Sequence, residues 1–280
     1  MSFRTYFEVA GADRSRLEHE LLAQRDRVAT RLNTVERVVA VMSGKGGVGK
    51  SHVCAALAGG AARLVQQGVG VVDADLRSPT VSRMLDARGP LIVTDDGVSP
   101  AVAIERIRVV SMDLLIEDRQ PLSWREPDGD SYLWRGAQEA GALREFLGDV
   151  AWGSLDVLLI DLPPGADGAM DLAALYPNIA GAVAVTIPSE ESGRSVARTI
   201  RASLAGGVTL LGVVENMSGC TCAACGSHGP LFAGSAGDEL AEEFGVPLLG
   251  KIPFRTAKTA SRFTGPEEKA LVERFLEVLA

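Results

Sequence analysis

The chain has 280 residues, which is enough for one large domain or two small ones with a buried core. Its 28 Lys and Arg residues against 36 Asp and Glu residues give a formal net charge of −8, which excludes the basic field that non-specific nucleic-acid binding requires. With 46% hydrophobic and 23% charged residues, the composition is that of an ordinary soluble globular protein.

Neither a membrane span nor a secretory signal is expected. The longest uncharged stretch, Leu172–Ser189, is interrupted by Pro177, and the N-terminus lacks an apolar segment with a small-residue cleavage site. Three of the four cysteines, Cys220, Cys222 and Cys225, fall within six residues. This spacing indicates metal or redox chemistry in a reducing compartment, so we expect a cytoplasmic protein without a disulfide framework.

The predicted elements follow one another in a regular alternation. From Asp13 to about Val35, apolar residues recur at helical spacing among charges, which predicts an amphipathic helix. Short apolar runs then predict strands at Arg37–Met42, Gly70–Ala74, Arg106–Ser111, Asp156–Asp161, Ala180–Ile187, Val208–Val214 and Leu248–Ile252. Further helices are expected at about 49–67, 137–150, 190–205, 235–244 and 266–279. Residues 87–105 and 112–135 show no period and are expected to form loops or a hairpin.

This alternation predicts an α/β fold. Continuous Val, Ile and Leu runs indicate strands that are covered on both faces, and the intervening helices imply right-handed crossovers. We therefore expect a three-layer α/β/α domain with a mainly parallel, doubly wound sheet over residues 37–280. Residues 1–36 form an N-terminal arm and the amphipathic helix in this division.

A phosphate-binding loop is the strongest motif. Residues 44–51 read GKGGVGKS, directly after a predicted strand and directly before a predicted helix. Glycines let successive backbone N–H groups surround phosphate oxygens, and the helix N-terminus adds a favourable dipole. Lys50 can reach the β- and γ-phosphates of ATP, and the Ser51 hydroxyl can coordinate Mg²⁺. The predicted nucleotide-binding residues of this P-loop NTPase are Gly44, Lys45, Gly46, Gly47, Val48, Gly49, Lys50, Ser51 and His52.

A second lysine in this loop points to a dimer. Lys45 cannot easily reach its own nucleotide from the direction of Lys50, and it is better placed to reach a nucleotide on a facing subunit. The loop is similar to the deviant Walker A loop of the MinD/ParA/Mrp class of dimeric P-loop ATPases. In that class the extra lysine contacts the partner's ATP, so the resemblance implies an ATP-dependent homodimer in which Lys45 is catalytic.

Three carboxylates follow predicted strands. Asp73 and Asp75 close the second strand, and Asp161 closes a later one, so all three should lie beside the phosphates. Carboxylates there can hold Mg²⁺ or orient the attacking water, although each could instead cap a following helix. Asp161 resembles the Walker B aspartate, and Pro163–Gly165 resemble a switch II turn. We expect Asp75 to position the attacking water and Asp73 to help hold the magnesium ion through its bound water.

A cysteine pair lies in a Gly- and Ser-rich segment at 218–229. Cys222 and Cys225 form a C-x-x-C motif, which brings two thiolates within reach of one metal or cluster but leaves the site half complete. Either Cys220 and His228 complete a mononuclear Zn²⁺ site within one chain, or a twofold dimer supplies the same pair again. The spacing leaves both possibilities open.

The chain resembles the Mrp/ApbC family of iron–sulfur cluster carrier ATPases over about residues 37–265. The resemblance rests on Glu215–Ser218 (ENMS), on the C-x-x-C followed by Gly226, on Leu249–Pro253 (LGKIP) and on Trp152–Gly165. It implies a slow ATPase whose dimer bridges a labile 4Fe-4S cluster and delivers it to apo iron–sulfur proteins.

The same resemblance assigns individual residues. It implies that Cys222 and Cys225 ligate the cluster, and that Asn216, Pro253 and Phe254 border the adenine. Two departures from the family pattern are relevant. His52 replaces the usual Thr beside the α-phosphate, and Cys220 occupies a usually aromatic position.

Two alternative functions remain open from the sequence. One is a MinD/ParA-like positioning ATPase, but the predicted last helix, Glu267–Ala280, is acidic and should be repelled by anionic lipid. The other is a P-loop ATPase adaptor with a structural zinc, because the third thiol, Cys220, could complete such a site.

Overall fold

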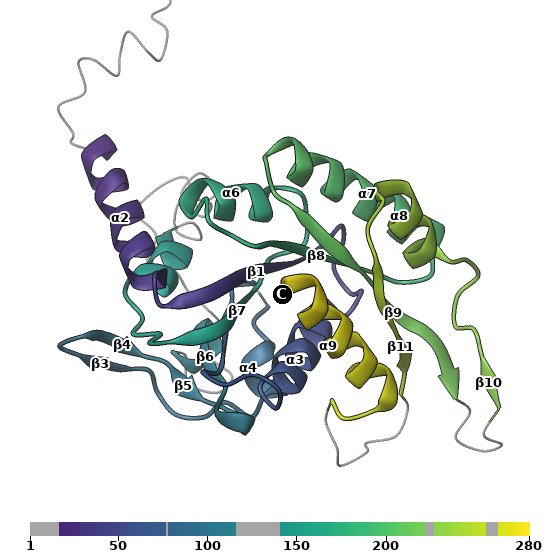
Figure 1. Cartoon of the computed structure of the whole chain (residues 1–280), viewed down its shortest axis with the longest axis horizontal. Helices are drawn as coiled ribbons and strands as arrows, with labels where there is room; N and C mark the ends of the chain where they lie inside the picture. Colours follow the sequence, from purple (N-terminus) through teal and green to yellow (C-terminus); the bar gives the residue numbers. More distant parts are fainter. Residues whose placement is uncertain (1–16, 77, 116–140, 222–226, 256–262) are drawn as a thin grey trace, which may run out of the picture.

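A computed structural model describes residues 17–76, 78–115, 141–221, 227–255 and 263–280 (Figure 1). Within these residues, nine strands form one sheet in the order β10-β9-β8-β1-β7-β2-β6-β5, and β11 pairs with β9. The strands are β1 Val35–Ser43, β2 Val69–Asp73, β5 Ala101–Val102, β6 Arg108–Ser111, β7 Leu155–Asp161, β8 Gly181–Thr186, β9 Leu210–Thr221, β10 His228–Gly229 and β11 Leu248–Phe254. The described pairs are parallel except β5 with β6 and β10 with β9. The predicted mainly parallel sheet is confirmed.

Helices cover both faces of this sheet. On one face lie α3 (Lys50–Ala61), α4 (Val81–Met84) and α9 (Pro266–Leu279). The other face is covered by α2 (Leu17–Leu32), helical residues 141–148, α6 (Asp167–Leu175), α7 (Glu190–Ala205) and α8 (Ala236–Phe244). The arrangement is the predicted three-layer α/β/α fold.

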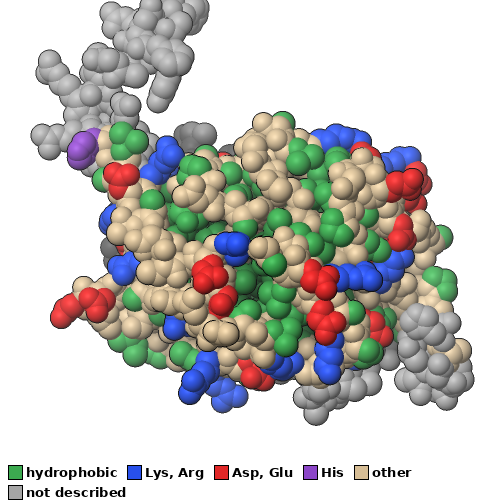
Figure 2. Space-filling model, viewed as in Figure 1, with side chains coloured by type: hydrophobic (Ala, Val, Ile, Leu, Met, Phe, Trp, Pro, Cys, Tyr) green, Lys and Arg blue, Asp and Glu red, His purple; other side chains and the backbone are tan. Residues whose placement is uncertain are grey.

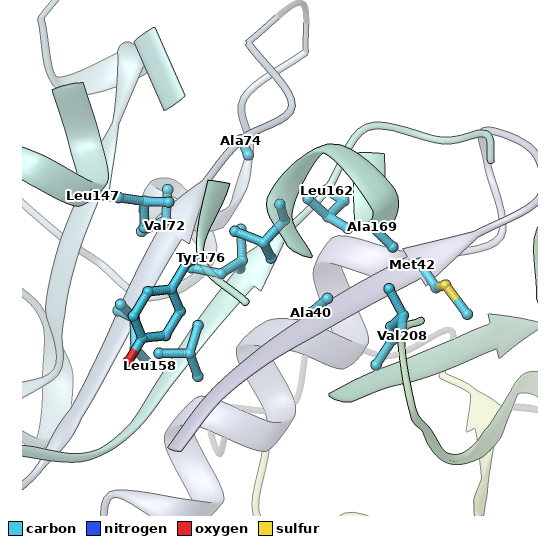
Figure 3. Close-up of a cluster of buried hydrophobic side chains, with 14 of the residues drawn as sticks. Ala40, Met42, Val72, Ala74, Leu147, Leu158, Leu162, Ala169, Tyr176 and Val208 are labelled. Carbon is cyan, nitrogen blue, oxygen red and sulfur yellow. The ribbon is translucent and has the colours of Figure 1, made fainter. Parts of the chain in front are cut away.

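The central strands are buried on both sides, as their unbroken apolar runs predict. In β1, Val38, Ala40 and Met42 belong to the core beneath α6 and α7, whereas Val39 and Val41 belong to the core beneath α3. Figure 3 shows part of the first core, in which Ala40 and Met42 lie near Ala169 of α6. Each face of the sheet therefore has its own hydrophobic layer.

Several element boundaries differ from the prediction. The helix after the phosphate loop ends at Ala61 rather than near residue 67, and Asp156 accepts hydrogen bonds from the amides of Gln67 and Gly68 in the turn before β2. The strand predicted to end at Val214 continues to Thr221, because β11 pairs with its second half as far as Cys220. Helix α6 was not predicted.

The segment at 87–105 contains the expected hairpin, with strands β3 (Ile92–Thr94) and β4 (Gly97–Ser99). Most of 112–135 lies outside the described residues.

No helix in the described part of the chain combines the length and apolar character needed to cross a bilayer. The longest uncharged stretch, Leu172–Ser189, contributes instead to the end of α6 and to β8. On the face shown in Figure 2, acidic and basic side chains are interspersed.

Candidate functional site

The phosphate loop lies between the end of β1 and the start of α3, as predicted. Gly47 and Gly49 have φ values of 82° and 78°, in the left-handed region that favours glycine. At Gly44, a Cβ atom would overlap the backbone of Ser195 in α7, whose hydroxyl donates a hydrogen bond to the Gly44 carbonyl at 2.9 Å. Ser195 carries no local sequence signal for this contact, which depends on the packing of α7 against the loop.

Asn216 braces the loop from β9. Its side-chain Nδ2 donates a hydrogen bond to the carbonyl of Val48 at 2.8 Å, and a Cβ atom on Gly49 would overlap this nitrogen. Ile252 pairs with Asn216 across the two strands, so Pro253 and Phe254 lie at the end of β11 close to this position. The structure therefore brings together the three residues that the resemblance assigns to the adenine.

Lys50 and Asp161 form a buried ion pair. The Nζ atom of Lys50 lies 2.6 Å from Oδ1 of Asp161, and the two side chains are 6% and 0% exposed. Burial raises the pKa of Asp161, while the charge and hydrogen bond of Lys50 oppose that rise. A lysine and an acid that are both expected at the phosphates are thus in direct contact.

Asp73 lies beside Asp161, since β2 and β7 pair these residues directly. Oδ2 of Asp73 accepts hydrogen bonds from the backbone amides of Thr80 and Val81, at 2.9 and 3.1 Å, where α4 begins. One of the two carboxylate oxygens of Asp73 therefore caps the start of α4, as the helix-capping alternative predicts.

The other oxygen of Asp73, Oδ1, is buried without a hydrogen-bond partner within the described residues, and so is Oδ2 of Asp161. Buried carboxylate oxygens without partners are suited to a hydrated cation. Within the described part of the chain, no group of three or more His, Cys, Asp or Glu side chains is arranged to hold a metal ion. A magnesium ion typically uses one or two carboxylates together with substrate phosphates, so the donor set fits Mg²⁺ bound with a nucleotide.

The buried position of Asp73 has a consequence for stability. Burial, reinforced by the charge of Asp161, raises its pKa from 3.8 to about 7. The folded state therefore binds a proton that the unfolded state has released, and the free energy of unfolding should fall as pH rises from 3.8 to about 7. The loss is at most about 4 kcal/mol, because one pKa unit corresponds to about 1.4 kcal/mol.

We expect Asp73→Asn to flatten this slope and to stabilise the nucleotide-free, magnesium-free protein at pH 8. Chemical denaturation at pH 5 and pH 8 measures the effect, with Asp149→Asn as a control at an exposed carboxylate. An unchanged slope in Asp73→Asn would show that this carboxyl is ionised in the folded state.

The remaining predicted residues follow the ends of β1, β2 and β7. Lys45 is partly exposed, and its carbonyl accepts a hydrogen bond from the Ser43 hydroxyl at 3.1 Å. Asp75 is half-buried and close enough to Asp161 for its charge to raise the pKa of that carboxyl. The amide of Gly165 donates to the carbonyl of Ser43 at 2.9 Å, so the predicted switch II turn is attached to the phosphate loop.

His52 packs against an aromatic ring that sequence reasoning missed. Its ring centroid lies 5.5 Å from that of Phe263, just before α9. Burial lowers the pKa of His52; the charge of Glu268 opposes this effect and that of Arg255 adds to it. A contact between residues this far apart in the chain leaves no local sequence pattern.

The cysteine motif follows the end of β9. Cys220 is part of that strand and pairs with Gly229 of β10 and Phe254 of β11, whereas His228 pairs with Thr221. The two ends of the expected loop at 220–229 are therefore paired with each other, as the last residues of β9 and the strand β10. Cys222 and Cys225 lie outside the described residues.

Comparison with known sequences identifies relatives over most of the chain. The family model described as ParA, NUBPL iron-transfer P-loop NTPase, matches residues 34–273. The iron-sulfur cluster carrier protein of Saccharolobus solfataricus is 41% identical over 230 residues, covering 81% of this chain and 74% of that protein. The cytosolic Fe-S cluster assembly factor NUBP2 of Bos taurus is 38% identical over 233 residues, covering 81% and 82% of the two chains.

Solved structures also match the chain over most of its length. A nucleotide-binding protein from Archaeoglobus fulgidus, in complex with ADP, matches with a TM-score of 0.68 and 32% identity over 90% of this chain and 92% of that chain. The cell division ATPase MinD of Pyrococcus furiosus shares the fold, with a TM-score of 0.58 and 20% identity over 86% of this chain and 99% of that chain. The phosphate loop, the buried Lys50–Asp161 pair and these matches place the chain in the family of NUBPL iron-transfer P-loop NTPases.

Proposed function

We propose that the chain is an ATP-dependent iron–sulfur cluster carrier, a homodimer that bridges a labile 4Fe-4S cluster between two Cys222–Cys225 pairs and delivers it to apo iron–sulfur proteins. The names of the relatives support the cargo, and the name of NUBP2 as a cytosolic factor supports a cytoplasmic location. Nucleotide binding is supported by the phosphate loop and by the ADP complex of the Archaeoglobus protein.

The observation that carries the proposal is the path of β9. Within this strand, Asn216 contacts the phosphate loop and Cys220 lies four residues further along, two residues before Cys222. Between these residues the strand is irregular, because Met217 has a φ of 55° and the pairing with β11 shifts register between Ile252 and Phe254. The loop contact and the base of the cysteine motif still belong to the same strand, so a change at the phosphate loop can be transmitted to the motif along β9.

The residues at the loop have distinct roles in the proposed ATP hydrolysis. Lys50 binds the β- and γ-phosphates, and Ser51, Asp161 and Asp73 would hold a magnesium ion. Such an ion would neutralise negative charge on the phosphates. Asp75 orients the attacking water, and Lys45 contacts the nucleotide of the facing subunit.

Slow turnover is part of the proposal, because a nucleotide that serves as a conformational switch need not be hydrolysed rapidly. Binding and release of the γ-phosphate would shift the switch II turn, which is hydrogen-bonded to Ser43 beside the loop.

A membrane-recruited positioning ATPase is disfavoured by α9. Its apolar residues Leu271, Val272, Phe275 and Leu279 are buried in the core beneath α3, so this face is not available to a lipid surface. A structural zinc site is the other possible result of the experiment that follows.

The test is a quantitation of iron, sulfide and zinc on protein isolated and reconstituted without oxygen, combined with a mass measurement in the presence and absence of ATP. We expect about four iron and four sulfide per dimer and cluster transfer to an apo-ferredoxin. One zinc per monomer, with no iron taken up on reconstitution, would overturn the carrier assignment.

A further inference from the structure

The short helix α4 is held by two carboxylates, one at the end of β2 and one just after β6. At its start, Asp73 at the end of β2 accepts hydrogen bonds from the amides of Thr80 and Val81. The helix has four residues, and a single turn does not persist without such tertiary support. The position of α4 therefore depends on the groups that hold it.

The second carboxylate is that of Asp113, which follows β6. Arg83 donates two hydrogen bonds to this carboxylate, from Nε to Oδ2 at 2.7 Å and from Nη2 to Oδ1 at 2.6 Å. The hydroxyl of Ser82 also donates to Oδ2 at 3.0 Å. The hydrogen bonds from Arg83 hold the pKa of Asp113 below its usual value, so the carboxylate is charged at neutral pH.

Ser111 connects the carboxylate of Asp73 to the backbone of Asp113. Its hydroxyl donates to Oδ2 of Asp73 at 3.2 Å and accepts a hydrogen bond from the Asp113 amide at 3.2 Å. Both Ser111 and Asp73 are 0% exposed, so the bond between them is shielded from competing water. Asp113, Ser111, Asp73 and α4 thus form one closed hydrogen-bonded ring, which we call the α4 clamp.

The segment between β2 and the α4 clamp contains Asp75. At its start, the Ala74 amide donates to the carbonyl of Asp161 at 2.9 Å. In its middle, the Ser78 amide donates to the carbonyl of Asp75 at 3.1 Å and to its Oδ1 at 3.3 Å. Asp75 thus lies between a residue fixed in the sheet and α4, so a displacement of α4 would be transmitted to Asp75.

We propose that Asp113 is a positioning residue for nucleotide hydrolysis: through the hydrogen bonds that its carboxylate accepts from Arg83 and Ser82 it fixes α4 and thereby holds Asp75 in place beside Asp161. Asp113 has no direct contact with the phosphate loop in the hydrogen bonds of the described residues, so its effect passes through α4. This inference rests on the proposed ATP hydrolysis.

The test compares Asp113→Asn and Arg83→Gln with Arg27→Gln and Asp149→Asn. The control residues form another exposed ion pair, 3.4 Å apart, on α2 and the 148–153 turn. In single-turnover experiments with excess protein, we expect the two clamp variants to hydrolyse ATP about tenfold more slowly, because misplacing an orienting group is costly. Their Kd for ATP should stay within about twofold of the unmodified value, because Lys50 and the loop are intact.

Hydrogen exchange provides a second readout that does not depend on hydrolysis. The Thr80 and Val81 amides should exchange faster in Asp113→Asn than in the unmodified protein and in Asp149→Asn. A hydrolysis rate equal to that of the control variants, or a rate loss matched by an equal loss of ATP affinity, would overturn the positioning role. If the unmodified protein does not hydrolyse ATP, the proposed function fails, and unchanged exchange at Thr80 and Val81 would separately overturn the clamp.

Discussion

Replacing Lys50 with alanine is expected to weaken ATP binding at least about a hundredfold and to abolish hydrolysis, because this ammonium supplies the charge at the β- and γ-phosphates. The side chain is buried, and its Nζ atom lies 2.6 Å from Oδ1 of Asp161. Isothermal titration with ATP and magnesium measures the affinity, and a single-turnover assay measures the rate. An affinity within about threefold of the unmodified protein would contradict the assigned role.

The variant also leaves Asp161 buried without its counter-charge. Removing one partner of a buried ion pair costs about 3–5 kcal/mol, less whatever protonation of the carboxyl recovers. The double variant Lys50→Ala/Asp161→Asn should regain most of this stability without regaining ATP affinity. That pattern separates a binding defect from unfolding, and denaturant titration of the two variants measures it.

Lys45→Ala is the matched comparison in the same loop. Lys45 is partly exposed, and no ion pair in the described residues involves it. We expect this variant to bind ATP nearly normally but to lose hydrolysis and nucleotide-dependent dimerisation. If Lys45→Ala lowered ATP affinity as much as Lys50→Ala, the lysine would serve its own nucleotide, and the argument for a facing subunit would fail.

The phosphate loop could be predicted from the sequence because its requirements are local. Successive glycines, a lysine and a hydroxyl must follow one another between a strand and a helix, and residues 44–51 satisfy these conditions. The strands were predictable for the same reason, since Val, Ile and Leu runs report burial on both faces. Every strand predicted from such a run is present.

The contacts that hold the site together were not predictable in this way. Three of these contacts join residues far apart in the chain: the hydrogen bond from Asn216 to Val48, the hydrogen bond from Ser195 to Gly44, and the α4 clamp. Asp73 is the clearest example of a residue whose contacts could not be predicted from the sequence. Its place after a strand indicated the crevice, but the two amides that its Oδ2 binds depend on where α4 begins.

Cys222→Ser is expected to remove most of the iron that the reconstituted protein holds, from about four atoms per dimer to fewer than one, and Cys225→Ser should do the same. A bridging cluster needs both thiolates from each chain, and a serine hydroxyl is a poor ligand for iron in this setting. Anaerobic iron and sulfide quantitation, together with the visible absorption of the cluster, measures the loss. ATP affinity should not change, because the phosphate loop is untouched.

Cys220→Ser and Cys54→Ser are the matched controls. Cys54 is buried within α3, and Cys220 is held in the ladder between Gly229 and Phe254, so we expect both variants to retain the cluster. A mononuclear zinc site completed by Cys220 predicts the opposite, since Cys220→Ser would then lose metal as completely as Cys222→Ser. The ratio of metal retained by Cys220→Ser to that retained by Cys222→Ser therefore distinguishes a cluster shared across a dimer from an ion held within one chain.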